Sequence, residues 1–508
     1  MRSEDSKILF KKFCSDFIVV EKQGKNLCGT WNKDSLKPFV ECEPLNFEKP
    51  EFLTPEDMEG LQDVLGYKTK QFVVNLQEEF NTKEHRKALH LFIRQHFDNQ
   101  LVSSSTETGV EVSRYNTKKR KDARIEWPKD LGKFLHFTMK KTGHEVPYAL
   151  NAVSRAVGMM NSKAFNFAGS KDRRAVTFQR ISAFKLQDSK LRDVQERLAK
   201  LNIELSEFSY EQDQVRFGGH DGNVFYILLR NADIDEEKFE KVKSHGCLNV
   251  FGPQRFGSLS VNTADIGLLM LKEEYETAVN LLLDPGNVAS QQMKDLLKKY
   301  AESKSMNVLK EFPRHMESSN EGILIRSLSK NEEKKDKFLL ALLQLPMRNR
   351  SLYLHAYQSK IFNEFAEIYK NKHGIDYCIG KEIPLPCSEV DETFGEIYEI
   401  YLELLAKDGL TLESFKSKQT NFGIHMTKRD LVILPTDMSF KKIHHADPDE
   451  EMIFYPPPEK EQDFGEGYES ILLKFTLPPG GYATTVLYEL YGEHFKAGDG
   501  LNERVEVE

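Results

Sequence analysis

The chain has 508 residues, of which 39% are hydrophobic and 30% are charged, and its net charge is −8. This composition is typical of a soluble globular protein of two or three domains, and no apolar run approaches the ~18 residues of a membrane span. The six cysteines form no C-x-x-C pair, which favours a reducing compartment over a disulfide framework or a zinc ribbon. A net negative charge does not suggest nucleic acid, so any RNA site would need its basic side chains gathered in a cleft.

The N-terminal part is predicted to supply one strand and then a long insertion. Residues 13–22 are β-branched and aromatic, which favours a strand. The polar stretch over 31–130 does not fit the same sheet. It contains one helical pattern over 81–97, with Asn81 as the expected cap. We therefore interpret 31–130 as an insertion with a small core of its own.

From residue 131 onward, strand and helix patterns alternate. Strands are predicted over 134–141, 164–168, 175–186, 208–215 and 224–230, and helices over 146–159, 189–201 and 235–244. This alternation favours an α+β fold, with helices packed on one face of a mixed or antiparallel sheet.

Helical patterns dominate residues 257–440 and predict a second, helix-rich domain. They fall over 263–283, 291–303, 337–345 and 356–370. Residues 441–469 are rich in Asp, Glu and Pro and read as a solvated loop. Residues 470–508 then return to the first domain, with a strand over 471–477 and a helix over 482–490.

One aspartate, Asp172, lies between two of the predicted strands. Gly169 and Ser170 break the preceding apolar run and favour a tight turn. Asp172 would sit at its tip beside Lys171 and Arg173, and cations this close favour an ionised carboxylate and attract a phosphate backbone. The pattern indicates covalent chemistry on nucleic acid, and an exposed charged turn is the alternative interpretation.

Two further segments carry suitable chemistry. The string from Asn249 to Gly257 (N-V-F-G-P-Q-R-F-G) offers an amide for a base edge at Asn249, a stacking ring at Phe251 and a donor fork at Arg255. An ordered turn with its two Phe side chains in the core is the alternative. The strand over 13–22 ends in Glu21 and Lys22, which alone would indicate only an exposed strand end.

Together these strings resemble a known family. Gly169, Lys171, Asp172, Ala175, Thr177 and Gln179 fit G-x-K-D-x-x-A-x-T-x-Q, and the Asn249 string fits N-x-F-G-x-Q-R-F-G; both resemble signatures of the TruD family of pseudouridine synthases, and the insertion resembles that of its eukaryotic members. The resemblance implies a catalytic domain over 1–30, 131–256 and 470–508. It also implies an insertion over 31–130, a helix-rich TRUD domain over 257–440 and a loop over 441–469.

The resemblance also implies roles for individual residues. Asp172 would be the catalytic residue, with Asn249 and Phe251 lining the uridine pocket. Lys22 would be the counter-ion of Asp172, and Glu21 an orienting acceptor. Lys141 fits the end of a family strand, and we expect Lys171, Arg173 and Arg255 to join Glu21, Lys22, Lys141, Asn249 and Phe251 in binding the substrate or RNA.

The implied activity is the isomerisation of uridine to pseudouridine in tRNA, at position 13 of the tRNA, and in other RNAs. The reaction needs no cofactor or metal, and the target base must be flipped out or unpaired. Asp172 would act as a nucleophile or as the base of a glycal route, and both stay open.

The implied setting is an RNA-bound monomer of the nucleus or cytoplasm, away from membranes. Lys118 to Lys121 fit a nuclear-import signal, an RNA contact or a plain solvated run. Two alternative functions are a catalytically silent RNA-binding or chaperone protein of the same fold, and a glycosidase in which Glu21 supplies the second carboxylate.

Overall fold

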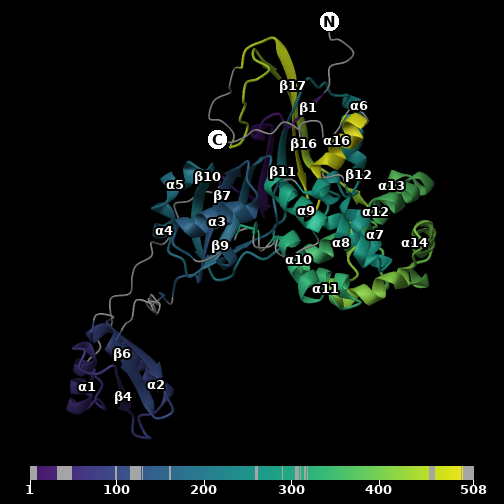
Figure 1. The fold of residues 1–508 in the computed structure, drawn as a ribbon. Helices are drawn as coiled ribbons and strands as arrows, with labels where there is room; N and C mark the ends of the chain where they lie inside the picture. Colours follow the sequence, from purple (N-terminus) through teal and green to yellow (C-terminus); the bar gives the residue numbers. More distant parts are fainter. Residues whose placement is uncertain are drawn as a thin grey trace.

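The structure is a computed structural model with three parts: a large sheet with its helices, a helix-rich part, and a small α/β unit (Figure 1). It describes residues 8–30, 49–97, 100–114, 127–128, 130–159, 162–257, 261–288, 290–303, 308, 311–313, 316, 319–456, 464–492 and 495. The basic run over 118–121 lies outside these residues. Within them, no helix combines the length and the apolar character that crossing a membrane requires.

The large sheet has the strand order β10-β7-β9-β2-β11-β17-β16. These strands are β2 (Phe17–Gln23), β7 (Phe134–Thr142), β9 (Val176–Phe184), β10 (Ile203–Glu211), β11 (Gly222–Arg230), β16 (Thr436–His445) and β17 (Tyr468–Leu477). The short strands β1 (Leu9–Phe10), β3 (Asn26–Leu27) and β8 (Phe165–Phe167) pair with β11, β2 and β9. The β2–β9 pair is parallel and the other described pairs of this sheet are antiparallel, so the predicted α+β fold with a mixed sheet is confirmed.

Helices cover one face of this sheet. They are α3 (Val146–Ala156), α4 (Asp188–Arg192), α5 (Gln195–Ala199), α6 (Glu236–His245) and α16 (Ala483–Tyr491). Strand alternation sends Phe17 and Val19 toward this face, into a core shared with α6 and α16. Ile18 and Val20 point the other way and pack with Tyr455.

Three predictions need correction within this part. The strand predicted over 208–215 is β10, which begins at Ile203 and ends at Glu211. The predicted helix over 189–201 is two short helices, α4 and α5. The predicted acidic loop is wrong for its first residues, because β16 extends to His445 and pairs with β17. Its polar composition concealed buried positions at Ile443 and His445.

The helix-rich part has its own core, with buried residues running from Leu248 to Val432. Its helices are α7 (Thr263–Leu271), α8 (Tyr275–Leu282), α9 (Gln291–Ser303), α10 (Asn320–Lys330), α11 (Lys337–Gln344), α12 (Met347–His373), α13 (Ile375–Cys378), α14 (Glu396–Lys407) and α15 (Gln419–Phe422). Two small ladders accompany them, β12 (Cys247–Leu248) with β15 (Val432–Ile433), and β13 (Glu382–Pro384) with β14 (Lys428–Asp430). The second domain predicted from the helical patterns therefore corresponds to a separate core.

The described residues of the insertion form a compact unit. It consists of α1 (Pro55–Leu65), β4 (Gln71–Asn75), α2 (Lys83–His96), β5 (Leu101–Ser105) and β6 (Gly109–Arg114), with strand order β4-β6-β5. Its core contains Leu61, Leu89 and Val110, as expected for an insertion with its own core. The cap of α2 is Thr82, whose Oγ1 accepts from the His85 N–H, whereas Asn81 donates to the carbonyl of Glu107.

Candidate active site

A cavity of about 460 Å³ lies on the helix-covered face of the sheet. Its walls come from β2, the loop over 168–175, the turn before β11, Gln254 and the segment after β17. Thus the structure brings the Asp172 segment next to both the N-terminal strand and the 249–257 string. These segments are far apart in the sequence, so their meeting depends on the tertiary fold.

Asp172 lies in the loop that joins β8 to β9. The strand–turn–strand arrangement is as predicted, but the connection over 168–175 is longer than a tight turn, because β8 pairs with residues 181–183 of β9 and not with its start. The Asp172 side chain is 25% exposed. It is therefore reachable from the cavity while its loop is held by the sheet.

Three residues hold Asp172. Its Oδ1 accepts hydrogen bonds from Lys11 Nζ at 3.2 Å and from Gln254 Nε2 at 3.0 Å. Its backbone carbonyl accepts from Lys141 Nζ at 2.8 Å. Among the described residues, both side-chain contacts fall on Oδ1, which leaves Oδ2 available to a substrate.

Lys11 was missed by the sequence interpretation. It is buried, lies 3.7 Å from the centre of the Phe17 ring and has a φ of 57°, a left-handed conformation that is unfavourable for a lysine. The predicted counter-ion, Lys22, follows Glu21 on β2, so alternation places it on the face opposite Val19 and the cavity. The counter-ion of Asp172 in the structure is Lys11 and not Lys22.

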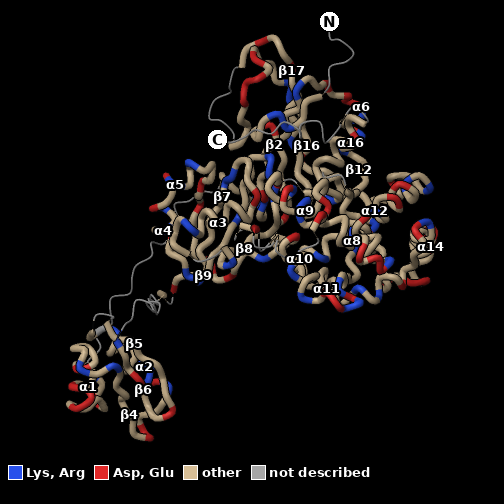
Figure 2. The backbone as a smooth tube through the Cα atoms, viewed as in Figure 1, with Lys and Arg blue, Asp and Glu red and all other residues tan. Residues whose placement is uncertain are grey.

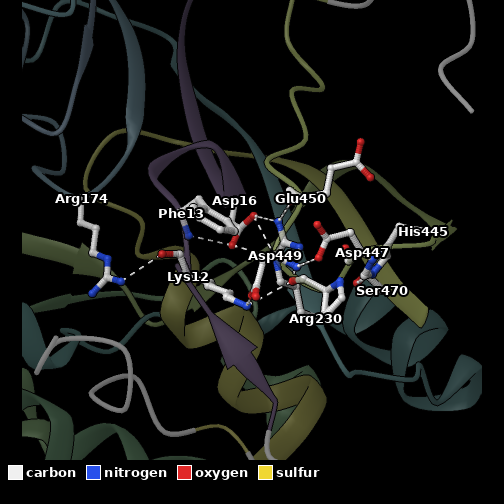
Figure 3. A network of polar contacts seen from close by, with 11 residues as sticks. Lys12, Phe13, Asp16, Arg174, Arg230, His445, Asp447, Asp449, Glu450 and Ser470 are labelled. Atoms are coloured by element: carbon white, nitrogen blue, oxygen red, sulfur yellow. Dashed lines mark hydrogen bonds and ion pairs between the residues drawn. The ribbon is translucent and has the colours of Figure 1, made fainter. Parts of the chain in front are cut away.

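A network of polar contacts fixes the segment that carries Lys11 (Figure 3). Asp16 and Arg230 form a fully buried ion pair, with Nη2 at 2.8 Å from Oδ1. Lys12 pairs with Asp449, and its carbonyl accepts from Arg174 Nη2 at 3.2 Å. Because Arg174 belongs to the Asp172 loop, this bond ties the loop to the segment that presents Lys11.

The cations next to Asp172 in the sequence do not contact its carboxylate. Lys171 turns inward and forms a buried ion pair with Glu21, with Nζ 3.0 Å from Oε2, and Arg173 is exposed. Glu21 also accepts from the backbone N–H of Arg180 at 3.2 Å. The cation that Glu21 contacts in the structure is therefore Lys171.

Lys141 is brought to Asp172 from the end of β7. Its side chain is fully buried, and this burial lowers the pKa of its ammonium group from 10.5 to about 8, against the opposing attraction of Asp172. A lysine with such a pKa changes its charge close to physiological pH.

Asn249 and Phe251 lie at the joint between the sheet and the helix-rich part. The Asn249 amide is occupied at both ends, because Oδ1 accepts from Arg429 at 2.5 Å and Nδ2 donates to the Asp430 carbonyl at 2.9 Å. Phe251 is bonded through its backbone to the Asn363 amide, and its ring lies 4.2 Å from the Arg429 guanidinium. Neither residue lines the cavity, so their predicted place in the uridine pocket is not seen here.

Arg255 is also engaged in this joint. Its Nε donates to Ser359 Oγ at 3.3 Å, and burial lowers the pKa of its guanidinium. Within the 249–257 string, the residue that reaches Asp172 is Gln254, which the sequence interpretation did not select.

Several cavity residues were not selected as site residues from the sequence. Tyr482 is an aromatic lining residue that follows the Pro-Pro-Gly-Gly segment, in a string that resembles the family. Phe217 lies at the rim with 80% of its surface exposed, His220 follows it in the turn before β11, and Asn223 is the second residue of that strand. The signal that could have found them is the glycine-rich turn R-F-G-G-H-D-G-N between two strands.

Comparison with known proteins agrees with this architecture. The family model for tRNA pseudouridine synthase D (TruD) matches residues 109–374 and 378–490, which is more than half of the chain. The chain belongs to the TruD family. As such it is an RNA pseudouridine synthase, an isomerase that moves the glycosidic bond of a uridine from N1 to C5.

Several relatives of this TruD-family enzyme are eukaryotic proteins. A putative pseudouridine synthase of Caenorhabditis elegans is 29% identical over 95% of this chain and 89% of its own length. The pseudouridylate synthase 7 homolog of Mus musculus is 26% identical over 95% of this chain and 78% of its own. The crystal structure of a putative TruD from Methanosarcina mazei, 23% identical, covers 71% of this chain and 88% of its own with a TM-score of 0.50, and it shares the fold.

Proposed function

We propose that Asp172 is the catalytic residue of this pseudouridine synthase and that the cavity beside it receives a uridine flipped out of its RNA. The observation that supports this most directly is the carboxylate itself. It is held at Oδ1 by Lys11 and Gln254, and Oδ2 is left for a substrate. A volume of about 460 Å³ is in the range of small-ligand sites.

The contacts define what the chain does during the reaction. Lys11 places a positive charge 3.2 Å from Oδ1 of Asp172 and orients the carboxylate. Lys141 holds the backbone of Asp172 and keeps the loop in place. From this position Oδ2 serves either as the nucleophile at C1′ or as the base that takes the C2′ proton, and both first steps release N1 of the uracil.

The natural substrate is proposed to be tRNA, at position 13, together with other RNAs. Support comes from the family model, which describes a tRNA pseudouridine synthase. A multisubstrate pseudouridine synthase 7 of Schizosaccharomyces pombe, 27% identical over 82% of this chain and 71% of its own length, supports a wider set of RNAs. A base in a helix must leave its stack to reach Asp172.

The rim of the cavity offers contacts for the rest of the RNA. Phe217 is an exposed ring on which a base can stack, and exposed Arg173 can meet a phosphate. Stacking on an aromatic contributes about 1–3 kcal/mol per base, so Phe217 is proposed to hold a nucleotide beside the target.

The test is release of tritium from C5 of uridine in a tRNA transcript. Wild type is expected to release it, and Asp172→Ala is expected to show no release above background while binding the transcript with an unchanged dissociation constant. Phe217→Ala should instead raise the dissociation constant by about 10-fold, with a single-turnover rate constant near that of wild type. Equal release by Asp172→Ala and wild type would overturn the catalytic role, and no release by either protein would favour a silent RNA-binding protein.

A further inference from the structure

Asn223 stands out at the start of the most deeply buried strand of the sheet. All nine residues of β11 are buried, and between its two ends the strand carries apolar residues and Tyr226. Arg230 at the far end has a full set of partners in Asp16 and two backbone carbonyls. The side chain of Asn223 is 9% exposed and has a single hydrogen-bond partner among the described residues. Its Nδ2 lies 3.3 Å from His220 Nε2, whereas its Oδ1 has no partner among them.

The register of the sheet directs Asn223 toward the cavity. On β11, Asn223 is opposite Glu21 and Phe225 is opposite Val19, so all four side chains share one face. Phe225 and Val19 line the same cavity as Asp172, and so does Asn223 itself. An amide oxygen without a partner is costly to bury in a folded protein, and one on the wall of an active-site cavity calls for a ligand.

His220 determines what Asn223 presents. Because the amide Nδ2 donates to His220 Nε2, the imidazole carries its proton on Nδ1, which is also buried and without a partner. Burial and the charge of Lys171 lower the pKa of His220 and keep the ring neutral. Among the described residues, the pair therefore leaves one acceptor, Asn223 Oδ1, and one donor, His220 Nδ1–H, without a partner; with the amide reversed it would still leave one of each.

The backbone of this wall is fixed before any substrate arrives. The Gly218 N–H donates to the carbonyl of Ala168 at 2.7 Å, which joins the turn to the Asp172 loop. On the other side, Asp221 accepts from the Gly24 N–H at 2.6 Å and donates through its own N–H to the Lys22 carbonyl at 3.0 Å. Groups that are fixed in this way can bind a ligand without a large loss of conformational entropy.

We propose that Asn223, oriented by His220, binds the imide edge of the target uracil and makes the site specific for uracil over cytosine. Asn223 Oδ1 accepts the N3–H, and His220 Nδ1–H donates to the adjacent carbonyl oxygen. Cytosine has no hydrogen at N3, so its ring nitrogen would face the amide oxygen as a second acceptor. This assignment rests on the proposal that the Asp172 cavity receives the uridine.

The imide edge suits the reaction as well as the substrate. Turning the uracil about the axis through N3 and C6 exchanges N1 with C5 and O2 with O4. The N3–H stays in place and is still flanked by two carbonyl oxygens, so Asn223 and His220 make the same contacts before and after the turn. The wall can therefore hold the detached base in both of its orientations.

The experiment compares two RNAs that carry tritium at C5 of a single target nucleotide, either uridine or N3-methyluridine. Wild type should react with N3-methyluridine at least about 100-fold more slowly in single turnover, because the methyl group removes the N3–H donor and meets the amide oxygen. In Asn223→Ala, the rate on uridine should fall by about 10–100-fold with little change in RNA affinity, and methylation should now cost less than about 5-fold. His220→Ala should lower the methylation penalty in the same direction.

Asn331→Ala, which removes an amide from the helix-rich part, is the matched control and should keep the wild-type penalty. An equal methylation penalty in wild type, Asn223→Ala and His220→Ala would overturn the proposal, as would a wild type that accepts N3-methyluridine freely. The wild-type comparison needs no variant, so it holds even if Asn223→Ala does not fold. Release from unmodified RNA by wild type reports the proposed function separately.

Discussion

Lys141 couples the charge of the active site to pH. Its pKa of about 8 means that the ammonium group loses its proton as pH rises through 8, which removes the positive charge on the side of the Asp172 backbone and leaves that of Lys11. We expect the single-turnover rate of wild type to have a descending limb near pH 8. Lys141→Arg keeps a charged side chain and should lose this limb, whereas Lys141→Met should be about 10-fold slower at pH 7 and flat near pH 8. Rates from pH 6 to 9.5 check this, and an identical limb in all three proteins would assign it to the RNA.

The lowered pKa of Lys141 also makes the free energy of unfolding depend on pH. Between pH 8 and 10.5 the unfolded lysine binds more protons than the folded one, so the free energy of unfolding rises with pH in this window. Relative to Lys141→Met, wild type should gain up to roughly 3 kcal/mol across it. Urea unfolding at pH 7.5 and 10 measures the change, and a constant difference between the two proteins would contradict the lowered pKa.

At the residue scale, the sequence allowed selection of those site residues that belong to a continuous motif. Asp172, Lys141 and Glu21 were selected because each belongs to a string with its own signature. Lys11, Gln254 and Asn223 were not, because their roles come from contacts with residues more than 80 positions away or from sheet register. Lys22 was selected because it belongs to the same motif as Glu21. The two side chains nevertheless point to opposite faces of the sheet, because they are neighbours on β2.

At the scale of elements, the packing of α7 on α12 makes a sharp steric prediction. A Cβ added to Gly267 on α7 would lie 2.2 Å from the backbone oxygen of Tyr353 on α12. Alanine favours helices by about 1 kcal/mol over glycine, so without this contact Gly267→Ala would stabilise the protein. We expect it instead to destabilise by about 2–3 kcal/mol, because a backbone atom cannot rotate away.

Asn280→Ala on the exposed side of α8 is the control for this prediction, since it also raises helix propensity but meets open solvent. Its free energy of unfolding should stay within about 0.5 kcal/mol of wild type. Stabilisation by Gly267→Ala would show that α7 and α12 separate without cost.

The elements that sequence patterns missed share a physical cause. α12 as a whole is only weakly amphipathic, and its buried residues belong to the core of the helix-rich part. β16 alternates buried and exposed positions irregularly around a register shift near its start, so its polar residues suggested a loop. Both elements are stabilised by contacts between residues far apart in the sequence, which local propensities do not indicate.

At the scale of the whole molecule, charge is dispersed and not divided between parts. Both signs occur in the sheet part, the helix-rich part and the inserted unit (Figure 2). This agrees with a net charge of −8 in an RNA-modifying enzyme, because the cations nearest Asp172 are the largely buried Lys11, Lys141 and Lys171 and do not form a basic surface. Association with RNA is then expected to depend on local contacts at the rim more than on long-range attraction.

The inserted unit is expected to be dispensable for the fold of the rest of the chain, because its core consists only of its own residues, from Leu53 to Val112. Replacing residues 49–114 with a flexible linker of about 20 Gly and Ser residues removes this core and leaves the other cores complete. We expect the shortened chain to unfold cooperatively, with a melting temperature within a few degrees of wild type, and to keep releasing C5 tritium from a short uridine-containing hairpin. Thermal melts and the hairpin assay check both expectations. A shortened chain that melts non-cooperatively would show that the unit supports the catalytic sheet, because an independent core contributes nothing to the packing of another.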